Sequence, residues 1–336
     1  MFEQYKSAIV GLGQVAWKMD KNHDRLGIWT HAEAYLRCSS TDLVAGFDPV
    51  KGERETFSDY YPITKTYSSL DKMMQKEEPD IVSICTPTAT HLDVIKQLVE
   101  YPVKAIFCEK PLHFSSIHSE SIIELCERKN IILAVNYMRR WENLYLKIKE
   151  LIDSKELGVL KSVVGYTNTA LYMNASHMID LIIMLCGRIY KIYGGKIDDS
   201  YIRVVHGVQD YGGFFHFATI NGVEGFLYAF CDDVKKHQFE IDLQFTNGRI
   251  VVTRDGLCHY LYKYENSSSL PDKKDLGAGE IIQFIKNERM VSAVNNICQV
   301  LDGRDDTTEC TGRDAIESIR VIEAFLDSEG ETIYVD

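Results

Sequence analysis

The 336-residue chain lacks any apolar run approaching the ~20 residues that a membrane span needs. Its first six residues carry charge and lead straight into a strand pattern, without the basic start and cleavage site of a signal peptide. The nine cysteines include no C-x-x-C pair and are irregularly spaced, which argues against a disulfide framework or a zinc site. We therefore expect a cytoplasmic protein with free thiols, no bound metal and no membrane partner.

Basic residues are also scarce. The chain has 37 Lys and Arg against 49 Asp and Glu, a formal net charge of −12. A surface this acidic repels phosphate backbones, so nucleic acid is not an expected partner. Hydrophobic residues make up 45% and charged residues 26%, which is ordinary globular composition. Because the length exceeds that of one typical core, the chain is predicted to form two domains.

Residues 1–137 alternate short apolar runs with segments of helical spacing such as 91–99. The runs are nearly continuous in apolar character, as strands buried on both faces are. They cover residues 8–10, 43–45, 80–85, 103–108 and 131–135. The alternation predicts an α/β domain with a doubly wound parallel sheet of the Rossmann type, in which ligands bind at the carboxyl ends of the strands.

Residues 138–336 are predicted to form an α+β domain for substrate binding and oligomerisation. Residues 238–245 alternate strictly between apolar and polar side chains, which is typical of a half-buried antiparallel strand. Three turn dipeptides separate strand patterns and indicate hairpins: Asn221-Gly222, Asn247-Gly248 and Asp255-Gly256. We expect an antiparallel meander over 201–264, packed on helices that include 178–186, with an open face. A loop is predicted over 267–280, and helices over 291–301 and 315–326.

A glycine-rich hexapeptide, Gly11-Leu12-Gly13-Gln14-Val15-Ala16, follows the first strand pattern. The first glycine permits a tight turn, the second lets the backbone approach a pyrophosphate, and Ala16 is small enough for close helix packing. We expect the turn to open a helix whose N-terminus faces the phosphates. A glycine turn of purely structural use is the alternative.

Asp48 ends the second strand pattern, where an acid binds the ribose hydroxyls of NAD and repels the extra phosphate of NADP. It lies 32 residues past Ala16, whereas about 20 are usual. The polar segment 18–30 is interpreted as an insertion that accounts for the excess. NAD is the expected cofactor, and the nearby Lys51 keeps NADP as an alternative.

Glu109-Lys110-Pro111 ends another buried strand pattern, beside the expected cofactor edge. A lysine there can polarise or deprotonate a hydroxyl once burial lowers its pKa. The alternative is a surface lysine paired with Glu109.

Together these pieces resemble the Gfo/Idh/MocA family of oxidoreductases, named after glucose–fructose oxidoreductase and inositol dehydrogenase. The matching pieces occur in family order over residues 5 to 187. They are Gly11–Ala16, Asp48-Pro49, Thr86-Pro87 with His91, Glu109-Lys110-Pro111-Leu112, Asn136-Tyr137 with Arg139-Arg140, Glu156-Leu157-Gly158, and His177 with Asp180. The motif around Lys110 is the most specific.

The resemblance implies an NAD(P)-dependent dehydrogenase or reductase acting on a carbinol carbon of a sugar, cyclitol or sugar nucleotide. Lys110 and His177 would be the catalytic residues, and a cis bond is often found before Pro111. The expected cofactor residues are Gly11, Gly13, Gln14, Val15, Ala16, Asp48, Thr86, Pro87, His91, Glu109 and Lys110. The expected substrate residues are Lys110, Tyr137, Arg139, Asn174 and His177. Arg139 and Arg140 could bind a substrate phosphate or carboxylate, or form a solvated or inter-domain charge pair.

His177 also has a physical interpretation. Ser176 can cap a helix that starts there and Gly187 can end it. His177 would then lie in the first turn, where the helix dipole disfavours imidazolium and leaves a ring able to act as a base. The alternative is a histidine packed beneath the sheet.

One departure from the family pattern concerns Met173, which stands where many catalytic members carry an aspartate four residues before the histidine. Asn174 could hold a substrate hydroxyl, and Asp180 is expected to orient its neighbours. The departure leaves two alternatives to an enzyme: a regulatory protein that senses NAD(H) or a metabolite, and a structural subunit. By family habit we expect a homodimer or homotetramer formed through the C-terminal sheet.

Overall fold

The computed structural model describes residues 4–21, 27–62, 64–205, 207–230 and 237–335. The chain forms two compact units, one of Met1–Glu142 with Asn287–Ile316 and one of Asn143–Lys286 with Glu317–Asp336. The predicted boundary after residue 137 therefore differs from the observed one by a few residues. The larger difference is the return of 287–316 to the first unit.

The first unit contains a six-stranded sheet in which every neighbouring pair is parallel, as predicted. The strand order is β3-β2-β1-β4-β5-β6. The strands are β1 (Tyr5–Val10), β2 (Thr41–Phe47), β3 (Lys65–Tyr67), β4 (Ile81–Ile84), β5 (Ala105–Cys108) and β6 (Ile132–Val135). The order reverses between β1 and β4, so the loops after these two strands diverge there, which is where doubly wound sheets bind ligands.

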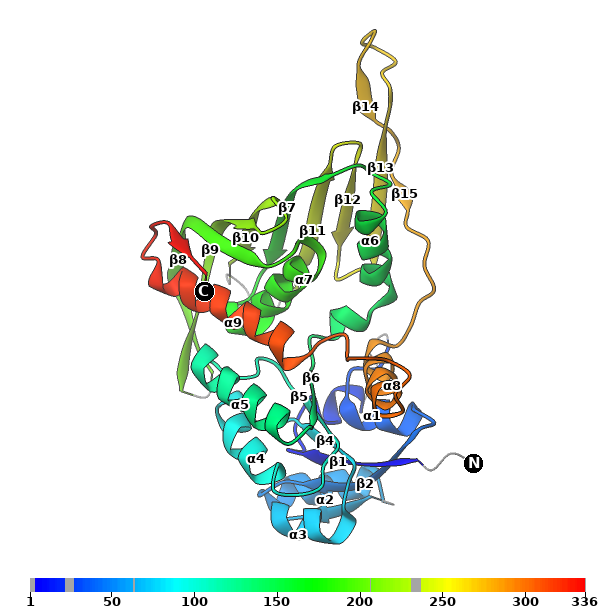
Figure 1. Cartoon of the computed structure of the whole chain (residues 1–336), viewed down its shortest axis with the longest axis vertical. Coiled ribbons are helices and arrows are strands. Elements are labelled where there is room, and N and C mark those ends of the chain that lie inside the picture. Colours follow the sequence, from blue (N-terminus) through cyan, green and yellow to red (C-terminus); the bar gives the residue numbers. More distant parts are fainter. Residues whose placement is uncertain (1–3, 22–26, 63, 206, 231–236, 336) are drawn as a thin grey trace. The chain divides into compact units, whose positions relative to one another are not determined.

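Helices connect these strands and cover the sheet. They are α1 (His31–Arg37), α2 (Lys51–Tyr60), α3 (Leu70–Glu77), α4 (His91–Leu98), α5 (Ser116–Arg128) and α8 (Arg289–Leu301). Short 3-10 turns η1 (Lys18–Asp20), η2 (Thr88–Thr90) and η3 (Met138–Trp141) complete the unit. Helix α4 packs against α5, and α1 packs against α8 (Figure 1).

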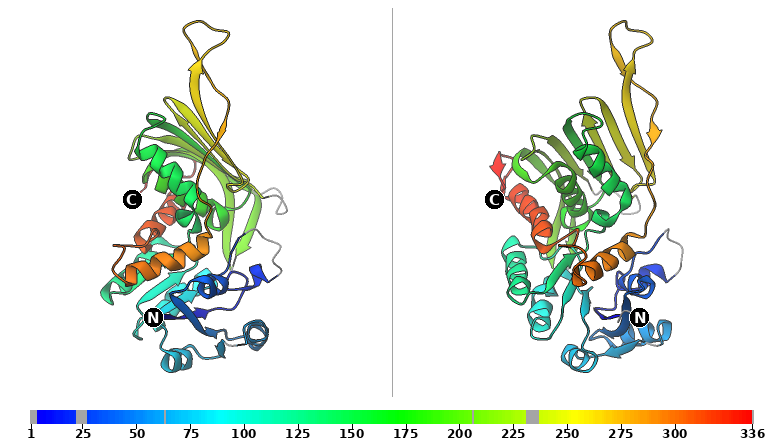
Figure 2. Two further views of the ribbon diagram at one scale, coloured as in Figure 1. Left: turned by 90° about the vertical axis from the view of Figure 1, so that its right-hand side faces the viewer. Right: turned by 45° about the vertical axis from the view of Figure 1, so that its right-hand side comes forward.

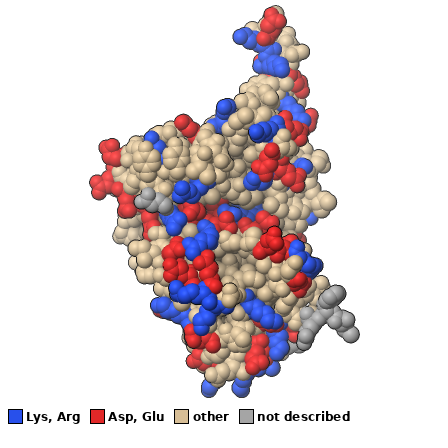
Figure 3. Space-filling view, viewed as in Figure 1, with Lys and Arg blue, Asp and Glu red and all other residues tan. Residues whose placement is uncertain are grey.

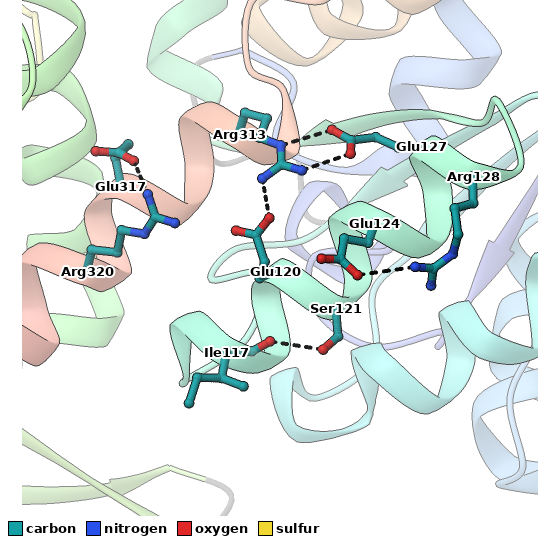
Figure 4. Close-up of polar contacts among 9 residues, drawn as sticks. All are labelled: Ile117, Glu120, Ser121, Glu124, Glu127, Arg128, Arg313, Glu317 and Arg320. Atoms are coloured by element: carbon teal, nitrogen blue, oxygen red, sulfur yellow. Dashed lines mark hydrogen bonds and ion pairs between the residues drawn. The ribbon is translucent and has the colours of Figure 1, made fainter. Parts of the chain in front are cut away.

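The returning segment 287–316 is fastened to the first unit by its backbone and by ion pairs. The amide of Val135 on β6 donates to the carbonyl of Cys310 at 3.0 Å. Arg313, in the first turn of α9 (Gly312–Asp327), forms ion pairs with Glu120 and Glu127 on α5 (Figure 4). These contacts explain why this late stretch of sequence belongs to the first unit.

The second unit contains a ten-stranded sheet of order β14-β13-β12-β11-β7-β10-β9-β8-β16, with β15 paired to β13. Its strands are β7 (Leu160–Thr167), β8 (Ile189–Val205), β9 (Val208–Thr219), β10 (Glu224–Ala229), β11 (Phe239–Phe245), β12 (Gly248–Thr253), β13 (Cys258–Asn266), β14 (Lys274–Leu276), β15 (Glu280–Ile281) and β16 (Ile333–Tyr334). The three predicted hairpins are present as β9–β10, β11–β12 and β12–β13.

Two details of this sheet correct the prediction. The meander is interrupted, because β7 lies between β10 and β11, parallel to β10 and antiparallel to β11. The predicted loop 267–280 contains β14, which pairs with the end of β13 and forms a long hairpin that projects from the sheet (Figure 1). Neither pairing is signalled by alternation within a single strand.

Helices cover one face of the ten-stranded sheet (Figure 2). Helix α7 (Ser176–Cys186) packs on β7 and on α6 (Asn143–Asp153). A Cβ at Gly165 would lie 2.7 Å from Cγ of Met178, so the glycine permits this close approach. Phe325 of α9 packs on Phe215 of β9 with ring centroids 4.8 Å apart. The opposite face lacks such a cover among the described residues.

Charges of both signs are interspersed on the face shown in Figure 3. The acidic excess therefore does not gather into a patch of one sign there. Among the described residues, none of the helices is long and apolar enough to span a membrane.

Candidate active site

The glycine turn follows β1 at the carboxyl edge of the parallel sheet. Gly11 has φ of +90°, and a Cβ there would lie 2.9 Å from the backbone of Cys85 and Thr86. Gly13 differs, because a Cβ built on it meets nothing within 4 Å. The turn is therefore packed tightly at its first glycine and open at its second. Such an open backbone fits the close approach of a pyrophosphate.

The helix expected directly after the glycines starts later than predicted. Turns follow the glycines, and α1 begins only at His31. The amides of His31 and Ala32 donate to the carbonyls of Val15 and Ala16 at 3.2 and 2.9 Å. Helix α1 therefore takes up the hydrogen bonding where the turn leaves it, and the segment predicted to be an insertion lies between them in the sequence. The predicted helix N-terminus at the phosphates was wrong, because the insertion separates it from the glycines.

Asp20 closes this insertion. Its Oδ2 accepts hydrogen bonds from the amides of Trp29 and Thr30 at 3.0 and 2.9 Å and from the Thr30 hydroxyl at 2.8 Å. The carboxylate thereby fixes the end of the insertion and the start of α1.

Asp48 lies at the end of β2, beside the glycine turn. Its Oδ2 accepts from the amide of Leu12 at 2.9 Å, and its Oδ1 accepts from the amide of Val50 at 2.8 Å. A guanidinium nitrogen of Arg54 donates to the backbone carbonyls of Asp48 and Pro49 at 2.7 and 3.0 Å. The acid thus holds the turn in shape, and each carboxylate oxygen retains a lone pair for a ribose hydroxyl.

Glu109, Lys110 and Pro111 follow β5, and the Lys110–Pro111 peptide is cis, as the resemblance implied. Oε1 of Glu109 accepts from Nδ2 of Asn136 at 2.6 Å and lies 3.0 Å from Nε2 of His31. Burial by itself raises the pKa of Glu109, but the hydrogen bonds of His31 and Asn136 and the charge of Lys110 hold it below its ordinary value. The edge therefore presents an ionised carboxylate next to the half-buried Lys110.

Thr86, Pro87 and His91 occupy the loop after β4 and the start of α4. Thr86 is half-buried and Pro87 is exposed, so both are accessible at the edge. His91 is fully buried, with ring nitrogens 3.0 Å from the carbonyl oxygen of Thr86 and 3.1 Å from that of Leu112. Burial lowers the pKa of His91. The structure favours a supporting role for this ring, which joins two loops from beneath, over the predicted direct contact.

Tyr137, Arg139 and Arg140 lie at the end of β6 and in η3, and all three are buried. Arg140 donates to the carbonyl of Glu309 at 3.2 Å and lies 3.4 Å from a carboxylate oxygen of Asp314. Arg140 is thus buried in a charge pair inside the first unit, which differs from the solvated or inter-domain pair that was the predicted alternative to substrate binding. Tyr137 and Arg139 remain predicted substrate residues.

In the second unit, His177 lies in α7, directly after a π-helical turn, η4 (Leu171–Ala175). The Ser176 hydroxyl donates to the carbonyls of Tyr172 and Met173, both at 3.1 Å. The prediction that Ser176 caps the helix was wrong, because helical structure already begins at Leu171. The argument from a helix dipole at His177 therefore falls as well. Gly187, at φ of +90°, ends α7 as predicted.

The turn before His177 is held by a buried acid. Oδ1 of Asp210, on β9, accepts from the amide of Tyr172 at 2.9 Å. Met173 and Asn174 are half-buried in the same turn, and a guanidinium nitrogen of Arg203 contacts the Met173 sulfur. π-Helical turns are frequent at functional sites, which agrees with the predicted roles of Asn174 and His177.

Comparison with known proteins identifies the class of the first unit. Residues 5–137 match a family described as an oxidoreductase family with an NAD-binding Rossmann fold. This is the Gfo/Idh/MocA family, and the likeness to it covers residues 5–137. The resemblance and the dinucleotide cofactor predicted from the motifs are confirmed.

Curated relatives and solved structures extend the likeness. The chain is 31% identical to scyllo-inositol 2-dehydrogenase (NAD(+)) of Bacillus subtilis over 167 residues, 50% of this chain and 45% of that protein. It thus spans about half the length of this relative. WlbA dehydrogenase of Bordetella pertussis, in complex with NADH and UDP-GlcNAcA, has a TM-score of 0.76 at 17% identity and 99% coverage of both chains. Levoglucosan dehydrogenase in complex with NADH has a TM-score of 0.81 at 14% identity, covering 99% of this chain and 100% of the other. These structures establish the fold of both units.

Proposed function

We propose that the protein is an NAD-dependent dehydrogenase or reductase that acts on a carbinol carbon of a sugar, cyclitol or sugar nucleotide. The observation that carries the proposal is the grouping of functional side chains at one edge of the parallel sheet. The open Gly13 backbone, Asp48 and the pair Glu109-Lys110 follow strands that are neighbours in the order β2-β1-β4-β5. The substrate class is supported by the similar proteins, one of which is named an inositol dehydrogenase and another of which is solved with a sugar nucleotide.

The residues of the edge fit an NAD molecule. Gly11 and Gly13 would admit its pyrophosphate, Asp48 its adenosine ribose, and Glu109 the hydroxyls near the nicotinamide. When bound, NAD+ supplies the acceptor for the electron pair and hydrogen that leave the carbinol carbon. Lys110, beside the carboxylate of Glu109, would hold the substrate hydroxyl by a hydrogen bond, and His177 would take its proton.

The proposal is tested by the absorbance of NADH near 340 nm. The protein, Lys110→Met and His177→Asn are mixed with NAD+ and a panel of inositols, sugars and sugar nucleotides. Lys104→Met is the matched control, because Lys104 is an exposed lysine directly before β5 that pairs with Asp80 at 2.8 Å. We expect turnover with at least one substrate, a loss of at least ~100-fold in both site variants, and no loss in the control.

Binding of NADH is measured in parallel by fluorescence titration. Binding without turnover over the whole panel would contradict an enzyme and favour a sensor of NAD(H), with Met173 in place of a carboxylate as the motivating residue. Absence of binding in the folded protein would overturn both.

We further propose that two or four copies of the chain associate through the uncovered face of the ten-stranded sheet. Aromatic side chains line up across three neighbouring strands of this face, where Tyr166, Tyr228 and Phe214 are paired in register. Tyr166 stacks on Tyr228 at 5.4 Å, and Phe226 stacks on His216 at 4.6 Å. Contiguous exposed apolar surface of this kind marks interaction sites. We propose a second copy as the occupant, because a two-fold axis would bring this aromatic face against the same face of the other chain.

A cytoplasmic location completes the proposal. The cysteines that the structure describes are all free, and most of them are buried. Free buried thiols are usual in reducing compartments, and fractionation of the source cells followed by immunoblotting would test the location.

A further inference from the structure

A chain of buried polar groups runs beneath the cofactor edge of the first unit. The hydroxyl of Tyr35 lies 2.7 Å from Oγ of Ser83, which lies 2.8 Å from Nδ1 of His31. Nε2 of His31 lies 3.0 Å from Oε1 of Glu109, which also accepts from Asn136. Tyr35, Ser83 and His31 are all 0% exposed. We call these five residues the Glu109 network.

One arrangement of hydrogens satisfies the whole network. Burial raises the pKa of Tyr35 far above its ordinary value, so its hydroxyl keeps its hydrogen and donates to Ser83. The Ser83 hydroxyl then donates to Nδ1 of His31. Nε2–H of His31 faces Glu109, which is ionised and can only accept. The hydrogen bond from Ser83 to Nδ1 thereby fixes the tautomer and the orientation of the His31 ring.

Burying these polar groups in an apolar environment costs free energy of folding unless each of them is hydrogen-bonded. The His31 ring packs on Phe107 with centroids 4.6 Å apart, and every residue of β4 and β5 is buried. A buried polar pair stabilises the fold only when each group has its hydrogen-bond partners. Apolar residues of similar volume would fill the same space without this desolvation cost. The network ends at Glu109, whose side chain is 12% exposed at the functional edge.

The network leaves one oxygen of Glu109 for another partner. Oε1 receives both buried donors, His31 and Asn136. Among the residues that the structure describes, Oε2 accepts a hydrogen bond only from the amide of Lys110, at the long distance of 3.3 Å. Glu109 is therefore held at Oε1 by its two buried donors, and we call Oε2, which accepts from the amide of Lys110, its outer oxygen.

We propose that His31 is a positioning residue, which acts through Glu109 to fix the outer carboxylate oxygen that receives the hydroxyls of the bound dinucleotide. The proposal rests on the proposed function of the edge. The proposal adds a residue that follows the predicted insertion in the sequence. His31 is the first residue of α1, and its ring contacts Ser83 of β4 and Phe107 of β5. His31 itself touches neither cofactor nor substrate.

The test compares NADH affinity and kcat/KM for NAD+ in His31→Leu, His31→Gln, Glu109→Gln and the double variant His31→Leu/Glu109→Gln. We expect His31→Leu to lower kcat/KM and weaken NADH binding by about 10- to 100-fold, as misplacement of a site group by ~1 Å does. Gln retains one donor and one acceptor, so His31→Gln should recover most of the loss. In the double variant the loss should equal that of Glu109→Gln alone, because His31 acts through that carboxylate.

A matched pair of serines guards against a general effect on folding. Ser83→Ala removes the hydrogen bond to the ring of His31. Ser7→Ala removes an equally buried hydroxyl on β1, whose bond among the described residues is to the carbonyl of Asp42 at 3.0 Å. We expect weaker NADH binding in Ser83→Ala and unchanged binding in Ser7→Ala, with similar melting temperatures. If a purely structural role holds, both serine variants lose melting temperature and neither loses affinity.

The two proposals fail differently. NADH binding that is unchanged in folded His31→Leu overturns the role of His31 and leaves the dehydrogenase proposal intact. If the unaltered protein shows no turnover but the variants show the expected changes in NADH affinity, the dehydrogenase proposal is overturned. The role of His31 is then retained.

Discussion

At the scale of single residues, Asp48 combines two tasks that a substitution can separate. Its carboxylate accepts from the amides of Leu12 and Val50, and it is the residue proposed to bind the adenosine ribose. Asp48→Ala should therefore destabilise the fold by about 1–3 kcal/mol, because two backbone donors lose their acceptor. The melting temperature measures this cost, and Asp59→Asn, which removes an exposed acid of α2, is the control with the same change of charge.

The same residue should set the choice of cofactor. Loss of the carboxylate removes the repulsion of a 2′-phosphate, and Arg54 and Lys51 lie on the same turn. Asp48→Ser is expected to raise KM for NAD+ about tenfold, the loss of ~1.4 kcal/mol, and to lower KM for NADP+. Steady-state kinetics with both cofactors measure the shift. An unchanged ratio of kcat/KM values would show that Asp48 does not face the ribose.

Short motifs predict residues that stand at a fixed place in a local pattern, such as the end of a buried strand. Gly11, Asp48 and Lys110 were found because each follows a buried strand within a recognisable motif. His31 was missed, because its partners Ser83 and Glu109 lie 52 and 78 residues away. Its only local signal was a histidine at the start of a helical pattern, which by itself indicates nothing about a contact with a carboxylate.

At the scale of elements, the segment between β5 and α5 should make stability depend on pH. Burial, with the nearby positive charge of His118 and His91, lowers the pKa of His113 from 6.5 to about 4. The amide of Ser115 donates to its Nδ1 at 3.1 Å, which requires an unprotonated nitrogen there. Between pH 6.5 and 4 the unfolded chain thus binds a proton that the folded chain does not.

Stability from this group is therefore lost as the pH falls from 6.5 towards 4. His113→Asn keeps an acceptor for the Ser115 amide and removes the titration, so its melting temperature should fall less over this range than that of the unaltered protein. His118→Asn should give an intermediate slope, because one of the opposing charges is gone. Parallel melting curves for all three proteins would contradict the assignment.

Element boundaries show where pattern reasoning stops. Apolar runs predicted the parallel strands, and alternation with Asn-Gly turns predicted three hairpins, because both signals are local. The position of β7 between β10 and β11 depends on pairing with strands 62 to 85 residues away in sequence. The start of α7 was misplaced for a related reason, since the π-turn of η4 is held by Asp210 from a different strand.

At the scale of the whole molecule, one amphipathic helix could not be assigned from its sequence. The pattern over 291–301 predicted α8, and its apolar face required a partner. That partner is α1, more than 250 residues earlier, so the chain leaves the first unit and returns to it. A single boundary in the sequence cannot describe this chain, because the first unit is made of two separate segments. This holds even when the helices and strands are predicted correctly.

The uncovered face of the ten-stranded sheet carries the last prediction. If this face joins copies of the chain, Phe226→Lys should break the assembly, because a charge would be buried among the aromatic rings of two copies. Light scattering after size-exclusion chromatography should give the mass of two or four chains for the unaltered protein and of one chain for the variant. Ile117→Lys is the matched control, an equally drastic change at a 76% exposed residue of α5.

A single-chain mass for the unaltered protein at micromolar concentration would overturn the assembly, and an unchanged mass in Phe226→Lys would move the interface to another surface. Since Phe226 is 40% exposed and stacks on His216 rather than on the helices, loss of assembly without loss of melting temperature would identify a surface that the fold does not need and the oligomer does.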